Sequence, residues 1–522
     1  MDDGTWKMVA RDSDMLEGVP VVAAAGEEKV LLVRLDGTVR AWGHECPHYH
    51  EPLEEGVLLG HEIVCLRHHA RLDLTTGKMT APPAMNDLPA YPVKVENGEV
   101  WVGQGVKAVF PKPSGNDPRT FLVVGAGAAG NAAAETLRRE GFAGRIVMVS
   151  AEEERPYDRP ELSKGFITGK TKPEYIPLRG PKFYANQGIE LLIRSRVISL
   201  DTRKKTAALE GGQRIAFDKA LLASGGTPRL ASIPGAKADC CMQLRSLADA
   251  RKIAEAASRA KSAVIVGAGF IGMELASSLR DRGLAVTVVA PEALPFARIL
   301  GERIGEFVKK RHEAKGVTFR MGRTPTQVTG ALGAATVVLS DGTRLEADFV
   351  IFGLGIQPAV EYLEGTGLVE GGAVPVNAHL ETRVRDIFAA GDIAAVTLAS
   401  GETQRVEHWT VAERQGQHAA RAMLGGTRAY DEVPFFWTRQ AGFGLTYVGF
   451  VREFDEAACR GSVEEGKFLA GYFQKGRLRA AATVGLRSEL IAIEHLIRRG
   501  TPPTAMQLAD ESFDLGEAAR KS

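Results

Sequence analysis

The sequence predicts a multidomain fold with a small all-β domain at the N-terminus, two α/β domains built on parallel sheets, and an α+β domain at the C-terminus. Three observations carry this prediction. Residues 1–107 contain short apolar runs separated by turn dipeptides, which is the pattern of an all-β domain. Two segments of strand, Gly-rich turn and helix follow, 142 residues apart (Val123 against Ile265). The 522 residues also leave room for several domains of ~100–200 residues each.

The composition is that of an ordinary globular protein. Hydrophobic residues make up 44% of the chain, charged residues make up 25%, and the net charge is +1. This balance gives no electrostatic reason to expect a nucleic-acid partner or an anionic membrane surface. No apolar run is long enough to cross a bilayer, and the N-terminus lacks the basic and apolar parts of a signal peptide. We therefore expect a soluble, cytoplasmic protein in a reducing compartment, as a monomer or homodimer.

The all-β prediction for residues 1–107 depends on their turns. Asp36-Gly37 and Asn97-Gly98 each lie between strand-like runs and predict tight hairpins. Residues 108–118 then gather three prolines, a glycine and several polar residues, which is the composition of a linker. The first domain is therefore expected to end at residue 107.

Two cysteines and two histidines of this domain form a paired motif. Cys46-x-His48 is followed, after sixteen residues, by Cys65-x-x-His68. Five cysteines in the whole chain are too few for a disulfide scaffold, so these side chains are better explained as metal ligands. Zinc also binds two cysteines and two histidines, but its finger motif places both cysteines on one element and both histidines on another. The interleaved order favours an iron–sulfur cluster, and zinc is the alternative.

The first α/β unit carries a G-x-G-x-x-G turn between a buried strand and a helix. The first glycine allows the tight bend, the second lets the backbone approach a pyrophosphate, and the third lets the helix pack on the strand. An acid follows the next strand, 22 residues after the last glycine, where it can bond a ribose hydroxyl. The residues concerned are Gly125, Gly127, Gly130 and Glu152.

The second α/β unit repeats this turn at Gly267, Gly269 and Gly272. Glu292 lies 20 residues beyond Gly272, after the next strand. A carboxylate at this position accepts a hydrogen bond from the 2′-hydroxyl of NADH and repels the 2′-phosphate of NADPH, so NADH is favoured. The two units together predict two Rossmann-like nucleotide-binding domains.

Residues 119–522 resemble the pyridine nucleotide-dependent flavoprotein reductases, in the branch that holds oxygenase ferredoxin reductases and apoptosis-inducing-factor-like proteins. The similar segments are "RPYDRPELSK" (155–164), "ALLASGGTPR" (220–229), "IFAAGDIA" (387–394), "RVEHWTVAERQGQHAARAMLG" (405–425) and "VPFFWTRQ" (433–440). The resemblance implies FAD in the first site and NAD(P)H in the second. It also implies the division of the chain into FAD-binding segments 119–245 and 375–432, an NAD(P)H-binding segment 246–374 and a C-terminal interface domain 433–522.

The same resemblance implies roles for single residues. Asp392 matches the residue that binds the ribityl chain of FAD. Lys164 is implied to pair with Glu274 near flavin N5, where hydride arrives. The other positions that are implied to contact or flank the flavin are Arg159, Phe270, His408 and Trp437.

The motif of cysteines and histidines resembles that of a Rieske-type domain. The resemblance implies that Cys46 and Cys65 hold one iron of a 2Fe–2S cluster and that His48 and His68 hold the other. The remaining histidines of this region are expected to be solvated or hydrogen-bonded, not ligands: His44, His50, His61 and His69. His50 and His69 stand where such domains often have glycine, and the extra cysteine pair of respiratory-complex Rieske proteins is missing, which is typical of the ferredoxin-like type.

The combination implies an NADH-dependent reductase that passes electrons through FAD to the Rieske centre and on to a one-electron acceptor, which could be a ferredoxin, an oxygenase or a cytochrome. The helix after the first Gly-rich turn lacks the C-x-x-C of disulfide reductases, so electrons must leave the flavin by another route. Three alternatives stay open. The protein could be an NADH oxidase or quinone reductase with the Rieske domain as a docking or sensing module, it could be a redox-gated interaction protein, or the electron flow could run in reverse and produce NADH.

Overall fold

The N-terminal region of the computed structural model folds into three antiparallel sheets, of order β1–β11–β10, β2–β3–β4–β9 and β5–β6–β7–β8. The structure describes residues 6–112 and 114–522, so residues 1–5 and residue 113 of the predicted linker lie outside the described residues. The strands are β1 (Lys7–Arg11), β2 (Val21–Ala25), β3 (Glu28–Leu35), β4 (Thr38–Gly43), β5 (Val57–Leu59), β6 (Glu62–Val64), β7 (Arg71–Asp73), β8 (Met79–Ala81), β9 (Ala90–Tyr91), β10 (Val93–Glu96) and β11 (Glu99–Val102).

Both predicted hairpins of this region are confirmed. Asp36 and Gly37 connect β3 to β4 with φ angles of 53° and 72°, and Asn97 and Gly98 connect β10 to β11 with φ angles of 52° and 77°. Two successive positive φ angles are what the tight turn between two twisted strands requires. The described residues of the predicted linker contain neither helix nor strand.

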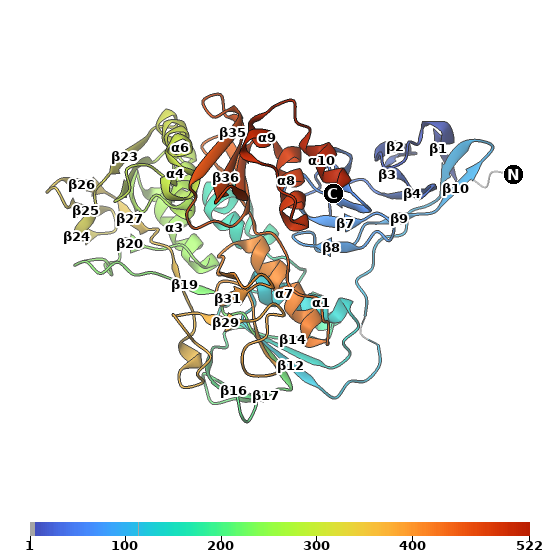
Figure 1. Cartoon of the computed structure of the whole chain (residues 1–522). Helices are drawn as coiled ribbons and strands as arrows, with labels where there is room; N and C mark the ends of the chain where they lie inside the picture. Colours follow the sequence, from blue (N-terminus) through green and yellow to red (C-terminus); the bar gives the residue numbers. More distant parts are fainter. Residues whose placement is uncertain (1–5, 113) are drawn as a thin grey trace.

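Two parallel five-stranded sheets form the nucleotide-binding units, and Figure 1 shows β12 and β14 of one sheet in the lower part and β20, β23 and β27 of the other at the left. Their orders are β14–β13–β12–β18–β30 and β20–β27–β21–β22–β23, so the first strand of each unit, β12 or β21, lies in the middle. A crevice for a nucleotide opens at this point, beyond the carboxyl ends of the strands. The elements are β12 (Thr120–Val124), α1 (Ala128–Arg139), β13 (Arg145–Val149), β14 (Ile189–Leu192), β18 (Lys219–Leu222), β20 (Cys241–Met242), α3 (Leu247–Arg259), β21 (Ser262–Val266), α4 (Phe270–Asp281), β22 (Ala285–Ala290), α6 (Glu302–Ala314), β23 (Val317–Met321), β27 (Phe349–Phe352), β30 (Ile387–Ala389) and α7 (Trp409–Met423).

Each parallel sheet has a small antiparallel sheet appended to it, which the sequence did not predict. The orders are β15–β16–β17 and β24–β25–β26, and shorter pairings join the units. β29 pairs with β31 across the predicted boundary at residue 374, and the domain boundaries stay predictions. The elements are α2 (Phe183–Asn186), β15 (Val197–Asp201), β16 (Thr206–Leu209), β17 (Arg214–Ala216), β19 (Gly226–Pro228), α5 (Ala297–Leu300), β24 (Pro325–Ala331), β25 (Ala334–Leu339), β26 (Arg344–Ala347), β28 (Ile356–Pro358), β29 (Val374–Val376), β31 (Ala394–Thr397) and β32 (Thr403–Gln404).

The C-terminal region is an antiparallel sheet of order β33–β34–β37–β36–β35, covered by helices. Beside the expected helix it has two short ones, whose starts are capped by Thr504 and Asp514. Figure 1 shows α8 and α10 next to the N-terminal region, and Leu59 and Val64 of that region pack into one apolar cluster with this domain. The elements are β33 (Phe435–Gln440), β34 (Phe443–Gly449), β35 (Glu456–Ser462), β36 (Lys467–Gln474), β37 (Arg477–Val484), α8 (Arg487–Arg499), α9 (Ala505–Ala509) and α10 (Leu515–Lys521).

No helix of the described part of the chain has the length and apolar character that a bilayer crossing needs.

Candidate functional site

The first Gly-rich turn joins β12 to α1 and leaves room for a phosphate group. Gly125 has a φ of 106°, which favours glycine. A Cβ on Gly130 would lie 1.9 Å from the carbonyl oxygen of Gly125, so only glycine lets α1 approach the strand this closely. A Cβ on Gly127 would meet no atom within 4 Å. The second glycine therefore borders open space at a helix N-terminus, where a pyrophosphate fits.

The second Gly-rich turn, between β21 and α4, repeats this geometry. Gly267 has a φ of 113°, and a Cβ on Gly272 would lie 2.1 Å from the carbonyl oxygen of Gly267. A Cβ on Gly269 would again meet no atom within 4 Å. Glu292 lies two residues beyond β22 with an exposed side chain, free to face a ribose at this edge of the sheet. Its part in choosing NADH stays a prediction.

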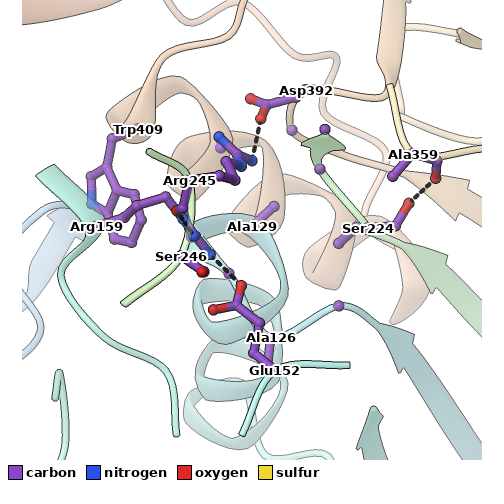
Figure 2. A pocket seen from close by; sticks show the side chains of 18 of the residues that line it. Ala126, Ala129, Glu152, Arg159, Ser224, Arg245, Ser246, Ala359, Asp392 and Trp409 are labelled. Atoms are coloured by element: carbon purple, nitrogen blue, oxygen red, sulfur yellow. Dashed lines mark hydrogen bonds and ion pairs between the residues drawn. The ribbon is translucent and has the colours of Figure 1, made fainter. Parts of the chain in front are cut away.

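A cavity of about 760 Å³ lies beside the first turn (Figure 2). This volume is typical of a site that binds a small molecule or cofactor. The cavity brings together ten of the residues that the sequence predicts, from segments far apart in the chain: Gly125, Gly127, Glu152, Arg159, Lys164, Phe270, Glu274, Asp392, His408 and Trp437. Gly130 lies behind this surface, and Gly267, Gly269, Gly272 and Glu292 are outside the lining.

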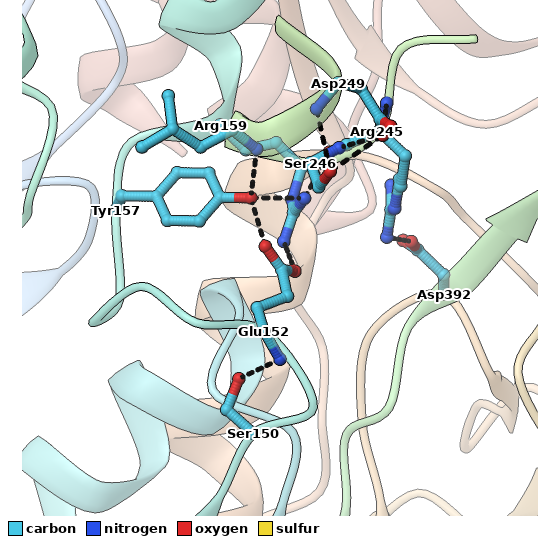
Figure 3. Close-up of polar contacts among 9 residues, drawn as sticks. Ser150, Glu152, Tyr157, Arg159, Arg245, Ser246, Asp249 and Asp392 are labelled. Carbon is cyan, nitrogen blue, oxygen red and sulfur yellow. Dashed lines mark hydrogen bonds and ion pairs between the residues drawn. The ribbon is translucent and has the colours of Figure 1, made fainter. Parts of the chain in front are cut away.

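Two carboxylates at this cavity are held by arginines. Glu152 accepts hydrogen bonds from Arg159 (2.8 Å) and from the hydroxyl of Tyr157 (2.5 Å), as Figure 3 shows. Burial alone would raise the pKa of Glu152, but the guanidinium of Arg159 and these hydrogen bonds hold it below its usual value. Asp392 accepts from Arg245 (2.8 Å), as Figure 2 shows. Both predicted acids therefore have an arginine partner and line the cavity.

Sequence reasoning missed Tyr157 and Arg245, which position these acids. Arg245 precedes the Ser246–Asp249 capping box that starts α3. The Ser-x-x-Asp spacing was visible in the sequence and would have located this helix start. No local pattern indicated that the arginine pairs with Asp392, because the two residues are 147 positions apart.

Lys164 and Glu274 form the predicted ion pair, with 2.9 Å between Nζ and Oε2. Glu274 is also held by the hydroxyl of Ser163 and by that of Thr438, whose Oγ1 lies 2.6 Å from Oε1. Gln440 donates to Thr438 (2.9 Å). The buried carboxylate of Glu274 therefore has partners for both oxygens, which fixes its orientation.

This chain of hydrogen bonds ends at His312, whose Nε2 lies 2.8 Å from the side-chain oxygen of Gln440. Burial lowers the pKa of His312 to about 4. The imidazole is therefore neutral at pH 7, and Nε2–H donates to Gln440. The sequence did not point to His312, because a lone histidine on a helix carries no local signal.

Aromatic side chains form one wall of the cavity. Phe270 stacks on Phe296 with ring centroids 4.5 Å apart, and it packs against Phe436 at 4.2 Å. His408 lies 4.8 Å from Phe436, and burial lowers the pKa of His408 to about 4. Phe270, predicted to shield the flavin, thus belongs to a layered cluster at the cavity. Its shielding role stays a prediction.

The two predicted ligand loops have the same backbone geometry. The N–H of His50 donates to the carbonyl of Cys46 (3.0 Å), and the N–H of His69 donates to the carbonyl of Cys65 (3.1 Å). His50 and His69 have φ angles of 56° and 55°. Glycine is the usual residue for such a conformation, and histidine is among the side chains that tolerate it best. Both histidines therefore occupy left-handed positions, a conformation that glycine adopts most readily.

The four predicted ligand side chains form a pair of thiols and a pair of imidazoles. The interaction between the thiols of Cys46 and Cys65 raises the pKa of Cys46 and lowers that of Cys65. The Nδ1 atoms of His48 and His68 lie 3.0 Å apart, so the two imidazoles face each other as the predicted ligand pair. Burial lowers the pKa of His48 to about 3 and that of His68 well below its usual value, so both are neutral and able to bind a metal.

This pairing fits a cluster with two irons. Within residues 6–112 and 114–522, no group of three or more His, Cys, Asp or Glu side chains is arranged to hold a single metal ion. A thiol pair and an imidazole pair, each for one iron, is the ligand set of a Rieske 2Fe–2S cluster.

One strand, β33, separates the ligand loops from the cavity. Alternate side chains of a strand point to opposite faces. Phe436 and Thr438 contact Phe270 and Glu274 on the side of the nucleotide-binding units. Trp437 packs its ring on His68 at 4.4 Å on the other side, and Phe435 does the same with His69 at 4.1 Å. Trp437 also lines the cavity, so a single side chain joins the predicted flavin site to a predicted cluster ligand.

Three family models match the chain. The model of the pyridine nucleotide-disulphide oxidoreductases matches residues 119–416, that of the Rieske [2Fe-2S] domain matches residues 5–92, and that of the reductase C-terminal domain matches residues 435–519. Within the described residues all five cysteines are free, and α1 has none, so the likeness to disulphide oxidoreductases does not include a disulfide centre.

Several known proteins are similar to the chain. Apoptosis-inducing factor 3 of Homo sapiens is 36% identical over 91% of this chain and 81% of its own. The ferredoxin–NAD(+) reductase component of the anthranilate 1,2-dioxygenase system of Burkholderia cepacia is 34% identical over 76% of this chain and 98% of its own. A ferredoxin reductase structure from Rhodopseudomonas palustris covers 77% of this chain and 100% of its own, with 33% identity and a TM-score of 0.74.

The two glycine turns and the acids that accompany them fit FAD and NAD(H), and the thiol and imidazole pairs fit a 2Fe–2S cluster, as the matching families imply. Zinc, the alternative for the cysteine and histidine motif, is thereby set aside. The chain therefore belongs to the pyridine nucleotide-disulphide oxidoreductase family, as a ferredoxin reductase-like flavoprotein oxidoreductase with an N-terminal Rieske domain.

Proposed function

We propose that the protein is an NADH-dependent reductase in which the fused Rieske domain is the one-electron outlet of the flavin site. The observation that carries this proposal is the contact of Trp437 with His68, at 4.4 Å between ring centroids, combined with the place of Trp437 in the cavity lining. Bound FAD would link two kinds of redox chemistry. NADH donates two electrons at once as a hydride, whereas a 2Fe–2S cluster accepts electrons one at a time.

The chain's own residues have separate tasks in this function. Glu152 and Asp392 would hold the ribose and ribityl hydroxyls of FAD, and Gly127 leaves space for its pyrophosphate. Glu292 would accept a hydrogen bond from the 2′-hydroxyl of NADH. The contact between Lys164 and Glu274 holds a charged hydrogen-bond donor at the cavity, and Thr438 keeps the carboxylate of Glu274 in place. The aromatic layer of Phe270 excludes water from the cavity wall.

The surface around the ligand loops offers an exit for electrons. Tyr49, beside the ligand His48, has 37% of its surface exposed, and its ring lies 4.2 Å from that of His48. Glu45 and His50 of the same loop are also exposed. We propose that a protein acceptor of single electrons, a ferredoxin, an oxygenase or a cytochrome, docks over this loop. The face of the domain that carries His68 is covered by β33 and is closed to such a partner.

An anaerobic titration with NADH tests the proposed function. We expect flavin absorbance to bleach and the electron paramagnetic resonance signal of a reduced Rieske cluster to appear within one turnover, since the cluster is the outlet. A flavin that becomes fully reduced while the cluster stays oxidised would contradict the proposal. In that case rapid oxygen consumption on admission of air would indicate an oxidase, and a long-lived reduced flavin would indicate a redox-gated interaction protein.

A further inference from the structure

The two histidines at the left-handed positions of the ligand loops have opposite environments. The side chain of His50 is 77% exposed, and its Nδ1 lies 2.8 Å from the carboxylate of Glu45 in the same loop. The side chain of His69 is fully buried. Histidine thus occupies the same position in both ligand loops, at the surface in one loop and inside the molecule in the other. Glycine would serve the turn equally well at both, so the imidazole of His69 needs another explanation.

Apart from its backbone N–H, which donates to Cys65 in the same loop, the buried His69 makes its polar contacts with other parts of the chain. Its Nδ1 hydrogen-bonds to Glu494 of α8, and its carbonyl oxygen accepts from Arg414 of α7 (3.2 Å). Its ring packs on Phe435 of β33 with centroids 4.1 Å apart. These contacts come from three elements of the reductase, α7, α8 and β33. All three meet at His69 of the Rieske domain.

A second buried ion pair completes this junction. Arg71, two residues further along the Rieske domain, pairs with Glu432, which lies 3.6 Å from Arg414. Arg414 in turn donates to Glu494 at 3.0 Å. Two arginines and two glutamates give a net charge of zero, and their side chains are between 1% and 15% exposed. Removing any one partner leaves a buried charge uncompensated, which makes the arrangement specific to one docking geometry.

We propose that these five residues form a docking lock that holds the Rieske domain in one orientation on the reductase: His69, Arg71, Arg414, Glu432 and Glu494. The lock places the adjacent ligand His68 against Trp437. His69 is accordingly a positioning residue, which sets the place of the cluster and does not bind it. The effect of the lock on electron transfer rests on the proposed function, whereas its effect on docking does not.

The test compares His69→Gly with the matched control His50→Gly. Both substitutions suit the left-handed turn and leave all four ligands in place, so the resonance spectrum of the cluster should be that of the wild type in both. We expect His69→Gly to raise hydrogen–deuterium exchange in β7 and α8, which the lock holds together. His50→Gly should leave the exchange of both segments unchanged.

Stopped-flow absorbance of the same holoproteins separates the two electron-transfer steps. We expect His69→Gly to slow cluster reduction about tenfold or more, because a loosely held centre loses its productive geometry, while flavin reduction by NADH keeps its rate. His69→Asn should restore most of the rate, since asparagine tolerates a positive φ and its amide can replace the Nδ1 donor. A loss of the cluster-reduction rate alone, restored by asparagine, distinguishes a positioning role of His69 from general destabilisation of the protein.

Glu494→Gln provides a second variant, far from the ligand loops, in case His69→Gly assembles no cluster. It removes the charge opposite Arg414, and we expect the same increase in exchange and the same slow cluster reduction. The lock is refuted if His69→Gly changes neither the hydrogen–deuterium exchange of β7 and α8 nor the rate of cluster reduction. If His69→Gly assembles no cluster, the same two measurements on Glu494→Gln decide the question. A wild-type cluster that NADH never reduces would refute the proposed function alone, because the exchange comparison still tests the docking.

Discussion

Glu274 illustrates how a single buried residue depends on parts of the chain that no motif connects. Its carboxylate is held by Ser163 and Lys164 from one nucleotide-binding unit and by Thr438 from the C-terminal sheet. The family resemblance supplied Lys164 and Glu274 as a pair. Ser163 and Thr438 were found only in the structure, because a hydroxyl that donates to a distant acid has no sequence pattern. The orientation of Glu274 is therefore a property of three segments together.

The buried His312 gives the protein a pH dependence of stability. Burial lowers the pKa of its folded form to about 4, below the 6.5 of an exposed histidine. The neutral form is thus favoured by folding, so this stabilisation is complete above pH 6.5 and is lost as the pH falls from 6.5 toward 4. The loss between pH 7 and pH 5 is about 2 kcal/mol of folding free energy.

Melting temperatures of the wild type and His312→Gln at pH 7 and pH 5 measure this contribution. Glutamine can still donate a hydrogen bond to Gln440 but does not titrate. We expect the melting temperature of the variant to fall by a few degrees less than that of the wild type between the two pH values. The other buried histidines are common to both proteins and cancel in this difference. Equal decreases would show that His312 does not titrate in this range.

The strand β33 shows what a regular element contributes to the site. Its pleat sends Phe436 toward Phe270 and His408, and it sends Trp437 toward His68. One strand consequently lines the cavity and also contacts the Rieske domain. The segment "VPFFWTRQ" was assigned to the flavin site by resemblance, and its second face became visible only when the sheet and the Rieske domain were in place.

Substitutions on the two faces of β33 should affect different steps. We expect Trp437→Leu to slow cluster reduction about tenfold, because the lost ring joins the cavity to His68, and to slow flavin reduction by NADH much less, although the ring also lines the cavity. Phe436→Leu, at the neighbouring position, is the control. It should slow flavin reduction, since it loosens the packing of Phe270 and His408, and it should leave the rate of cluster reduction unchanged. Rapid-mixing absorbance measures both rates. Identical profiles for the two variants would contradict the assignment of separate faces.

In the whole molecule, contacts at several places dock the Rieske domain on the reductase. Besides the lock, Tyr49 of the Rieske domain donates to Asp158 near the cavity, and Arg139 of α1 pairs with Asp87 at 3.1 Å. Phe110, in the linker, packs under the guanidinium of Arg139 with 4.4 Å to the ring centroid. Contacts at several separate places restrict the Rieske domain to one arrangement far better than a tether alone would.

A docked acceptor predicts intramolecular kinetics. We expect the rate of cluster reduction to be first order and constant over a roughly tenfold range of protein concentration. The same rate should change little from about 0.05 to 0.5 M salt, since buried charges are screened much less than exposed ones. Stopped-flow mixing with NADH measures it. The later transfer to an added protein acceptor is the comparison and should depend on salt, as encounters between separate proteins do. A rate of cluster reduction that rises with protein concentration would mean that electrons pass between molecules.

The sequence by itself determined the cofactors and the general architecture of this protein. Each nucleotide turn, hairpin and ligand loop is encoded within about two dozen residues, because backbone geometry and ligand spacing are local properties. The positions of Gly125, Asp36 and His50 at positive φ could be anticipated for that reason. The appended sheets and the short helices α9 and α10 could not, since short elements owe their form to packing.

Only the tertiary structure decided how the two redox modules meet. His69 and Glu494 are 425 positions apart, and neither stands in a pattern that indicates the other. The contact of Trp437 with His68 depends on the pleat of β33, the place of this strand in its sheet and the docking of a separate domain. Such contacts follow from burying apolar faces and from satisfying buried charges across the whole fold, and a local spacing does not encode that result.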